Sequence, residues 1–429
     1  MSSVSKRTGL LIGVVALVAV VAVALALAVG RAGSTSASGS ASTEAAATSG
    51  ALIVGTLLPA TGELASLGAP EFAGVRAAVS AINEAGGVLG MPVQTIEGDS
   101  GNKSELASLT LKRATDQGAQ VIIGPATSGL TLAMLGQTTA AGVVAFSPSS
   151  TSITLSDPVK TQGLFFRTVA PDTYQGSVLA DLAFNEGKRS VAIMQVDDEY
   201  GDGLGVAFTL AFEKLGGKVV AREVYNPDAT SFTDQVKKVK ATAPDGIALF
   251  GFSESTTVIS ELIAAGIGPQ EVTLYLCDGN MANSLATGLP SGTLDGVEGT
   301  IPGAAVDSEM QATLLAANPK LTSFEYGPES YDTAIITALA AESAGSVLAA
   351  EIAAQIPIVT ALGNTPCTTY AACLELLKAG KAISYQGPSG AQALRANGDP
   401  SVAVMGIWVF AANGQISPLK QVSGDVPLA

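Results

Sequence analysis

Residues 121–151 read VIIGPATSGLTLAMLGQTTAAGVVAFSPSST, and this stretch contains the pattern that decides the fold. The apolar run Val121–Ile123 predicts a buried strand, Gly129–Ala141 a helix, and Val143–Phe146 a second strand. Two strands joined through a helix form a βαβ unit, in which the strands lie parallel. The stretch therefore predicts a parallel sheet that is covered by helices.

The same alternation of strands and helices extends outward from this stretch in both directions. Toward the N-terminus it begins at the apolar run Leu52–Leu58. It breaks near Phe165–Val169 and then restarts, continuing to the strand Val272–Cys277. One long helix is expected at Tyr331–Ala353, and an apolar strand at Val402–Phe410. The predicted fold class is α/β, with two doubly wound parallel-sheet lobes.

The first 50 residues differ in composition from the rest of the chain. Lys6 and Arg7 precede an apolar run, residues 9–30, which Arg31 follows. The run is long enough to cross a bilayer, so a cleaved signal peptide and a retained membrane anchor both remain open at residues 1–31. Residues 32–50 are rich in Ser, Ala, Thr and Gly and predict a flexible tether. Basic residues before the run favour an extracytoplasmic location for the remainder.

Composition excludes several classes of function. The net charge is −15 and no basic stripe is visible, which argues against nucleic acid as a partner. The chain contains no histidine, which removes Ser-His-Asp and Cys-His catalysis and the commonest zinc ligand. We therefore expect no enzyme activity, no cofactor and no metal.

The chain has three cysteines, two of which lie close together. Cys367 and Cys373 flank a short segment and are candidates for a small-loop disulfide outside the cell. Two reduced cysteines are the alternative. Cys277 ends an apolar run and is expected to be a buried small hydrophobe.

Polar turns follow several of the predicted strands at the edge where open α/β sheets bind ligands. The turns at residues 124–129 and 147–151 supply hydroxyls and free N–H groups at helix starts, a chemistry suited to a carboxylate. Ordinary helix capping is the alternative. In the second lobe, Asp278 follows a strand and is a candidate countercharge for an ammonium group, or else a turn residue before Gly279.

At this point the sequence resembles the branched-chain amino-acid (Leu/Ile/Val) binding protein family, the type I solute-binding proteins of ABC transporters. The similarity extends from Ala51 to the C-terminus, and it rests on the order and spacing of several short segments. These segments are LPATG (58–62), INEAGGVLG (82–90), VIIGP (121–125), SPSST (147–151), FRT (166–168), DEYGDG (198–203) and SYQGPSG (384–390).

The resemblance implies two lobes joined by a three-strand hinge that closes on a ligand. Lobe 1 is then expected at 51–169 and 300–386, and lobe 2 at 170–299 and 387–429. The family also implies a ligand site, with Ser128 and Thr151 supplying hydroxyls to the ligand carboxylate and Ser149 a backbone contact. Tyr200 is implied as a cleft aromatic residue and Asp278 as the partner of the ligand ammonium.

The sequence departs from the family pattern at three places. Ser253 and Leu67 stand where well-known members carry aromatic ligand contacts, which argues against copying a Leu/Ile/Val preference. No cysteine ends the N-terminal apolar run, so a lipoprotein anchor is not expected.

The sequence thus predicts the extracytoplasmic solute-binding protein of an ABC importer. Its expected partners are an amino acid or related small molecule, the permease subunits, and the membrane through the N-terminal segment. Two alternatives remain open, a short-chain amide or urea binder and a membrane-tethered ligand sensor.

Overall fold

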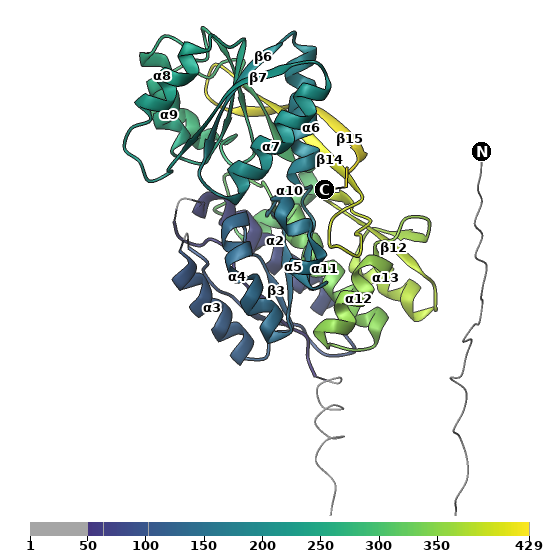
Figure 1. Ribbon diagram of the computed structural model, residues 1–429. Coiled ribbons are helices and arrows are strands. Elements are labelled where there is room, and N and C mark those ends of the chain that lie inside the picture. Colours follow the sequence, from purple (N-terminus) through teal and green to yellow (C-terminus); the bar gives the residue numbers. More distant parts are fainter. Residues whose placement is uncertain (1–49, 63, 102, 429) are drawn as a thin grey trace, which may run out of the picture. The chain divides into compact units, whose positions relative to one another are not determined.

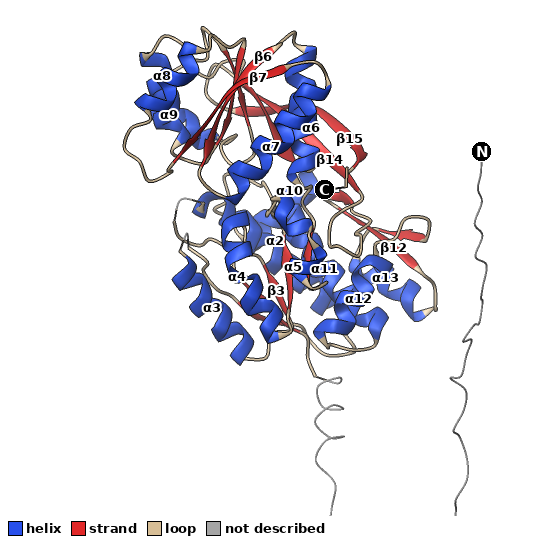
Figure 2. Ribbon diagram, in the orientation of Figure 1, coloured by secondary structure: helices blue, strands red, loops and turns tan. Residues whose placement is uncertain are grey.

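The computed structural model describes residues 50–62, 64–101 and 103–428. The expected signal or anchor at 1–31 and all but the last residue of the tether lie outside the described residues. The described residues form two α/β lobes, each built around a sheet, and a small third sheet (Figures 1 and 2). The predicted fold class is confirmed.

Lobe 1 contains a five-stranded sheet in the order β2-β1-β3-β4-β5, in which every pair is parallel. Its three central strands are almost fully buried, because helices cover both faces of the sheet. The elements are β1 (Ile53–Thr56), α2 (Ala65–Glu84), β2 (Gln94–Ile96), α3 (Ser104–Asp116), β3 (Val121–Ile123), α4 (Ser128–Ala141), β4 (Val144–Ser147), η1 (Ile153–Ser156), α5 (Pro158–Thr161) and β5 (Phe165–Arg167).

A later part of the chain returns to complete lobe 1. Its helix α11 packs along α2 and against α12, and its apolar side chains share one core with β1, β3 and β4. The returning elements are α10 (Ser308–Ala317), α11 (Gly327–Ala344), α12 (Ala349–Val359), β11 (Thr365–Cys367), α13 (Tyr370–Lys378), β12 (Ile383–Gly387) and β13 (Gly390–Ala391).

The long helical stretch expected at Tyr331–Ala353 is divided between two helices, α11 and α12. Gly345 ends α11 in the left-handed region, with φ of 64°, and α12 then leaves at a bend of 106°. Among the described helices, none alone has both the length and the apolar character of a membrane span, and α11 and α12 reach them only as this bent pair.

Lobe 2 contains a seven-stranded sheet in the order β15-β14-β10-β9-β8-β6-β7. The strands from β10 to β7 are parallel, whereas β14 and β15 join as an antiparallel hairpin at one edge. The elements are α6 (Asp172–Asn185), β6 (Ser190–Val196), α7 (Glu199–Lys214), β7 (Lys218–Tyr225), α8 (Thr233–Ala241), β8 (Gly246–Phe250), α9 (Ser255–Ala264), β9 (Thr273–Leu276), η2 (Asn283–Gly288), β10 (Glu298–Pro302), β14 (Val402–Phe410) and β15 (Ile416–Asp425).

The chain passes between the two lobes three times, after β5, after β10 and after β13. Because β13 pairs with β12, the last passage follows Ala391. The lobe limits drawn from the sequence stay a prediction.

A buried ion pair ties two of these passages together. Arg167, at the end of β5, is fully buried, and its guanidinium lies 2.7 Å from the carboxylate of Asp399. The same guanidinium donates hydrogen bonds to the carbonyl oxygens of Ser150 and Ser152. Arg167 therefore fixes the backbone of the polar turn that follows β4.

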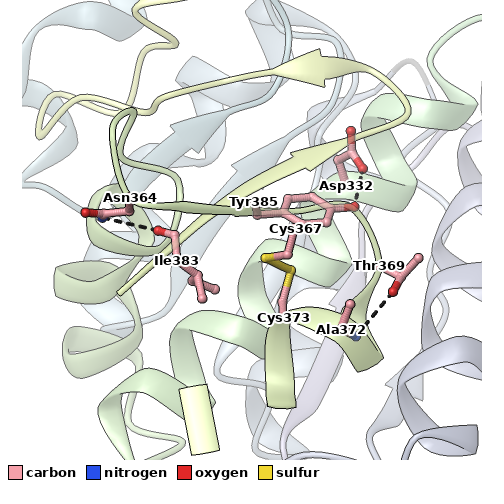
Figure 3. Close-up of a disulfide and its surroundings, with 8 residues drawn as sticks. All are labelled: Asp332, Asn364, Cys367, Thr369, Ala372, Cys373, Ile383 and Tyr385. Atoms are coloured by element: carbon pink, nitrogen blue, oxygen red, sulfur yellow. Dashed lines mark hydrogen bonds between the residues drawn. A yellow bond between two sulfur atoms is a disulfide. The ribbon is translucent and has the colours of Figure 1, made fainter. Parts of the chain in front are cut away.

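Cys367 and Cys373 form a disulfide between β11 and α13 in lobe 1 (Figure 3). Both cysteines are buried, and both belong to the same apolar core as α11 and α12. Nearby, the hydroxyl of Tyr385 donates a hydrogen bond of 2.7 Å to Asp332. The disulfide, one of the two states left open by the sequence, thus fastens the small third sheet to its helix.

Candidate functional site

The predicted site residues gather around one small cavity where lobe 1 faces lobe 2. We call it the interlobe cavity, and its volume is about 30 Å³, room for roughly one water molecule. It adjoins two larger spaces, of about 240 and 470 Å³, which are also lined by residues of both lobes. The lining residues are Leu64, Leu67, Ala126, Thr127, Ser128, Ser149, Thr151, Tyr200, Phe252, Asp278, Gly279 and Tyr326.

The N-terminus of α4 forms the lobe 1 side of the cavity. Thr127 caps this helix by accepting a hydrogen bond from the N–H of Leu130. The hydroxyl oxygen of Ser128 accepts hydrogen bonds from the N–H groups of Thr151 and Ser152. The hydroxyl of Thr151 is buried and lies next to the carboxyl group of Asp172. The N-terminus of α4 and two hydroxyl groups therefore lie together, which suits an anionic group.

Ser149 lines the same cavity, but its polar groups already have protein partners. Its hydroxyl donates a hydrogen bond of 2.6 Å to Glu71, and its N–H points to the hydroxyl of Ser147 at 3.3 Å. Glu71 is fully buried on α2, and burial raises the pKa of its carboxyl to about 8, although the Ser149 hydroxyl opposes the rise. Ser149 thus connects the cavity wall to a buried carboxyl group.

On the lobe 2 side, Asp278 follows β9 and receives three hydrogen bonds. Gln175 and the Tyr200 hydroxyl donate to one carboxylate oxygen, at 2.7 and 2.8 Å. The Tyr326 hydroxyl, which belongs to lobe 1, donates to the other oxygen at 2.5 Å. Burial, and next the charge of Asp278, raise the pKa of both tyrosines well above the ordinary value. Three donors therefore fix the orientation of the Asp278 carboxyl group at the junction of the lobes.

A second buried carboxyl lies behind this wall. Asp172, in the first turn of α6, is fully buried, and neither of its carboxylate oxygens has a hydrogen-bond partner of ordinary geometry among the described residues. Burial raises its pKa well above the usual value, the nearby Thr151 hydroxyl opposes the rise, and the charge of Asp278 adds to it. No lysine or arginine is among the described residues that line the cavity. The site thus has acceptors for a cation and no cationic side chain.

Ser253 is the one predicted site residue that does not line the interlobe cavity. It is exposed and lines an adjoining cavity of about 240 Å³, which also contacts Asp278. The aromatic wall comes instead from Phe252, whose ring stacks on Tyr200 with centroids 5.3 Å apart. Phe252 and Leu64 line both cavities, so the two cavities share part of their walls.

Sequence reasoning missed Tyr326, Gln175 and Glu71 as parts of this site. Tyr326 precedes α11 with φ of 61°, in the left-handed region, and only this turn directs its hydroxyl to Asp278. Gln175 and Glu71 lie inside helices, where the pattern marks them as ordinary polar positions. Phe252 was also not predicted. Its position next to Gly251, directly after a strand, is a signal that could have identified it.

Comparison with known proteins agrees with this architecture. The sequence model described as periplasmic binding protein matches residues 52–413. The substrate-binding protein BasB of a chemotactic signal transduction system in Halobacterium salinarum is 26% identical over 79% of this chain and 82% of its own length. An amino acid binding protein of Pseudomonas aeruginosa is 28% identical over 73% of this chain and 85% of its own length.

Solved structures show the same fold. The branched-chain amino acid transporter substrate binding protein LivJ from Streptococcus pneumoniae, in complex with isoleucine, has a TM-score of 0.71 at 22% identity and covers 87% of this chain and 100% of its own. A solute-binding protein of an R. palustris ABC transporter, in complex with 4-hydroxybenzoate, has a TM-score of 0.70 at 17% identity, covering 88% of this chain and 98% of its own. The family match spans most of the sequence, and the chain belongs to the periplasmic binding protein family.

Proposed function

We propose that this protein is the extracytoplasmic solute-binding protein of an ABC importer and that it binds an amino acid between its two lobes. The observation that carries the proposal is the position of Asp278, an anion held by three donors in the same cavity as the N-terminus of α4. Asp278 suits an ammonium group, and we call its side of the cavity the ammonium pole. The N-terminus of α4 suits a carboxylate, and we call its side the carboxylate pole. A zwitterion satisfies both poles.

At the carboxylate pole we assign the hydroxyls of Ser128 and Thr151 and the backbone at Ser149 as the contacts. The Thr151 hydroxyl lines the cavity and is able to donate to a ligand oxygen. The Ser128 hydroxyl at present holds the turn by accepting two N–H groups, and its own proton is free to face the ligand.

At the other pole we assign Asp278 to the ligand ammonium and Tyr200 to the ligand backbone. The adjoining cavity, with Phe252 and Ser253 in its wall, is then the place for the ligand side chain. Its wall combines the apolar Leu64 and Leu67 with hydroxyl groups, so it accommodates a side chain of mixed character.

Related proteins support this ligand class. A relative from Brucella abortus, 28% identical over 73% of this chain, is named a Leu/Ile/Val-binding protein homolog. A solute-binding protein with bound leucine from Desulfitobacterium hafniense shares the fold with a TM-score of 0.65. The R. palustris neighbour is in complex with 4-hydroxybenzoate, a carboxylate without an ammonium group.

The family consists of solute-binding proteins, and its members act outside the cytoplasm. We further propose that permease subunits receive the ligand and that the apolar segment at residues 9–30 directs or anchors the protein at the membrane. The buried Cys367–Cys373 disulfide agrees with an oxidising compartment.

The test separates the two poles with matched ligands. Isothermal titration calorimetry of the purified protein is carried out with leucine, with leucinamide, which lacks the carboxylate, and with isocaproate, which lacks the ammonium. We expect leucine or another amino acid to bind, and we expect both single-pole analogues to bind more weakly by at least about tenfold. The proposal would be refuted if every amino acid bound more weakly than the two analogues.

The matched variants are Asp278→Asn and Asp116→Asn. The first removes the anion at the cavity, and we expect a loss of about 2–5 kcal/mol in amino-acid binding because a desolvated charge pair is broken. The second removes the same charge from an exposed position on α3, and affinity should not change. Equal affinities in the two variants would remove Asp278 from the site.

A further inference from the structure

Glu71 lies directly behind the carboxylate pole of the interlobe cavity. Its side chain, on α2, is fully buried, and its Oε1 atom lies 2.6 Å from the hydroxyl oxygen of Ser149. The same hydroxyl oxygen lies 3.1 Å from the carbonyl oxygen of Ala126. Ser149 and Ala126 line the cavity, whereas Glu71 is not among the described residues that line it. One hydroxyl group therefore joins a buried carboxyl group to the wall of the cavity.

The number of protons in this contact favours a neutral Glu71. The Ser149 hydroxyl has one proton and two possible acceptors, the carboxyl group of Glu71 and the carbonyl oxygen of Ala126. If Glu71 is ionised, both acceptors compete for that proton. If Glu71 is neutral, its own O–H donates to the Ser149 oxygen, and the Ser149 hydroxyl donates to Ala126. The neutral state thus satisfies all three groups with two hydrogen bonds that run in one direction.

The second carboxyl oxygen of Glu71 leads to the same conclusion. Its Oε2 atom is buried and has no hydrogen-bond partner among the described residues. The carbonyl oxygen of a neutral acid tolerates this lack better than an oxygen of an ionised carboxylate, because a buried charge without donors is far more costly. Burial accordingly raises the pKa of Glu71 to about 8, although the Ser149 hydroxyl opposes the rise. Glu71 therefore carries a proton in most molecules at neutral pH.

The groups around Glu71 do not stabilise its ionised form. Burial raises the pKa of both Glu329 and Tyr326, and the charge of Glu71 adds to both rises. The turn at residues 147–151, which contains Ser149, has no ionisable side chain. Arg167, which donates to the backbone of this turn, is paired with Asp399.

The helices packed against α2 are α10, α11 and α13. The other ionisable groups on these four helices are Arg76, Glu84, Glu309, Tyr331, Asp332, Glu342, Tyr370, Glu375 and Lys378. The two cations in this set already have anionic partners, Glu97 for Arg76 and Glu375 for Lys378. The described residues of these helices therefore offer no unpaired cation to an ionised Glu71.

We propose that Glu71 is a positioning residue of the carboxylate pole, and that it holds Ser149 in the arrangement that binds a ligand carboxylate only while Glu71 carries its proton. The inference rests on the proposed function, because it concerns the same ligand carboxylate. An ionised Glu71 competes with Ala126 for the Ser149 proton and places a negative charge behind the pole. Repulsion between two anions weakens binding, so amino-acid affinity falls as the pH rises. Conversely, a bound carboxylate favours the protonated Glu71, so binding takes up protons.

The test is isothermal titration calorimetry with leucine at pH 6.5 and pH 8.5, with the tightest-binding amino acid in its place if leucine does not bind. We expect affinity about fourfold lower at pH 8.5, because only about a quarter of the Glu71 carboxyl groups keep their proton half a unit above a pKa of about 8. Titrations at pH 8 in two buffers with different heats of ionisation should show uptake of about half a proton for each bound ligand.

Three variants separate Glu71 from other groups that titrate. Glu71→Gln cannot ionise and still offers an N–H donor to Ser149, so its affinity should not depend on pH in this range and proton uptake should vanish. Ser149→Ala removes the hydrogen bond that lowers the pKa of Glu71, so the fall in affinity should move to higher pH. The matched control is Glu329→Gln, which removes a second buried carboxyl group with a pKa raised to about 8 and should keep the pH dependence.

The outcomes distinguish this inference from the proposed function. Amino-acid binding without a fall in affinity or proton uptake overturns the inference and leaves the proposed function in place. The same holds if Glu71→Gln keeps the pH dependence of the unmodified protein. If Glu71→Gln folds poorly, Ser149→Ala decides, and a fall in affinity at an unchanged pH overturns the inference. If no amino acid binds at any pH, the proposed function fails, and this inference fails with it.

Discussion

The ion pair between Arg167 and Asp399 provides a prediction whose size follows from the structure. Arg167→Met removes a guanidinium that donates to Asp399, to the carbonyl oxygens of Ser150 and Ser152, and to the Ser156 hydroxyl. The change leaves a carboxylate that is 2% exposed without its cation, and two carbonyl oxygens without this donor. Removing one member of a buried pair costs about 3–5 kcal/mol, which we expect as the loss in free energy of unfolding.

The assay is urea denaturation followed by the emission of Trp408. The matched control is Arg76→Met, because the pair of Arg76 with Glu97 is similar in chemistry but about half exposed, and its loss should cost no more than about 1 kcal/mol. The double variant Arg167→Met, Asp399→Leu should recover part of the loss, since it no longer buries an unpaired charge. A cost for Arg167→Met as small as that of Arg76→Met would refute the reasoning.

Three further predictions follow from other contacts. Replacing Cys367 and Cys373 by serine opens a loop with a sequence separation of 6 and should lower the free energy of unfolding by about 2 kcal/mol, measured by denaturation with and without reductant. The pKa of Glu71 is raised from 4.5 to about 8 in the folded protein, so the native state binds more protons than the unfolded state between these pH values. The free energy of unfolding should therefore fall by about 1.4 kcal/mol for each pH unit of increase in this range. Glu71→Gln should flatten this slope in urea titrations, and an unchanged slope would contradict the assignment. Tyr326→Phe removes a donor to Asp278 that joins the lobes, so amino-acid affinity in calorimetry should fall by about tenfold, and full affinity would show that the contact does not stabilise closure.

The alternation of strands and helices could be predicted from the sequence because it depends on local patterns. Val121–Ile123 is both the predicted and the observed extent of β3, and the helix that follows begins one residue before its expected start. The break between α11 and α12 was missed, because both sides are apolar and only the conformation of Gly345 separates them. The antiparallel β14–β15 hairpin was missed in part, since β15 is largely exposed and has no buried-strand pattern.

The candidate site was predictable where it depends on strand ends and not where it depends on long-range contacts. Asp278 and Thr151 follow β9 and β4, so the rule on ligand sites in open sheets finds them. Tyr326 reaches Asp278 across 48 positions of sequence, and its orientation depends on a left-handed turn that no pattern marks.

The way the chain returns to each lobe has a consequence for the order of events during folding. The core of lobe 1 includes side chains between Ala334 and Leu394, and that of lobe 2 includes Met405 to Val426. Neither core is complete until nearly the whole chain has been made, although domains usually fold in turn from the N-terminus. Both lobes therefore depend on the last part of the chain to complete their cores.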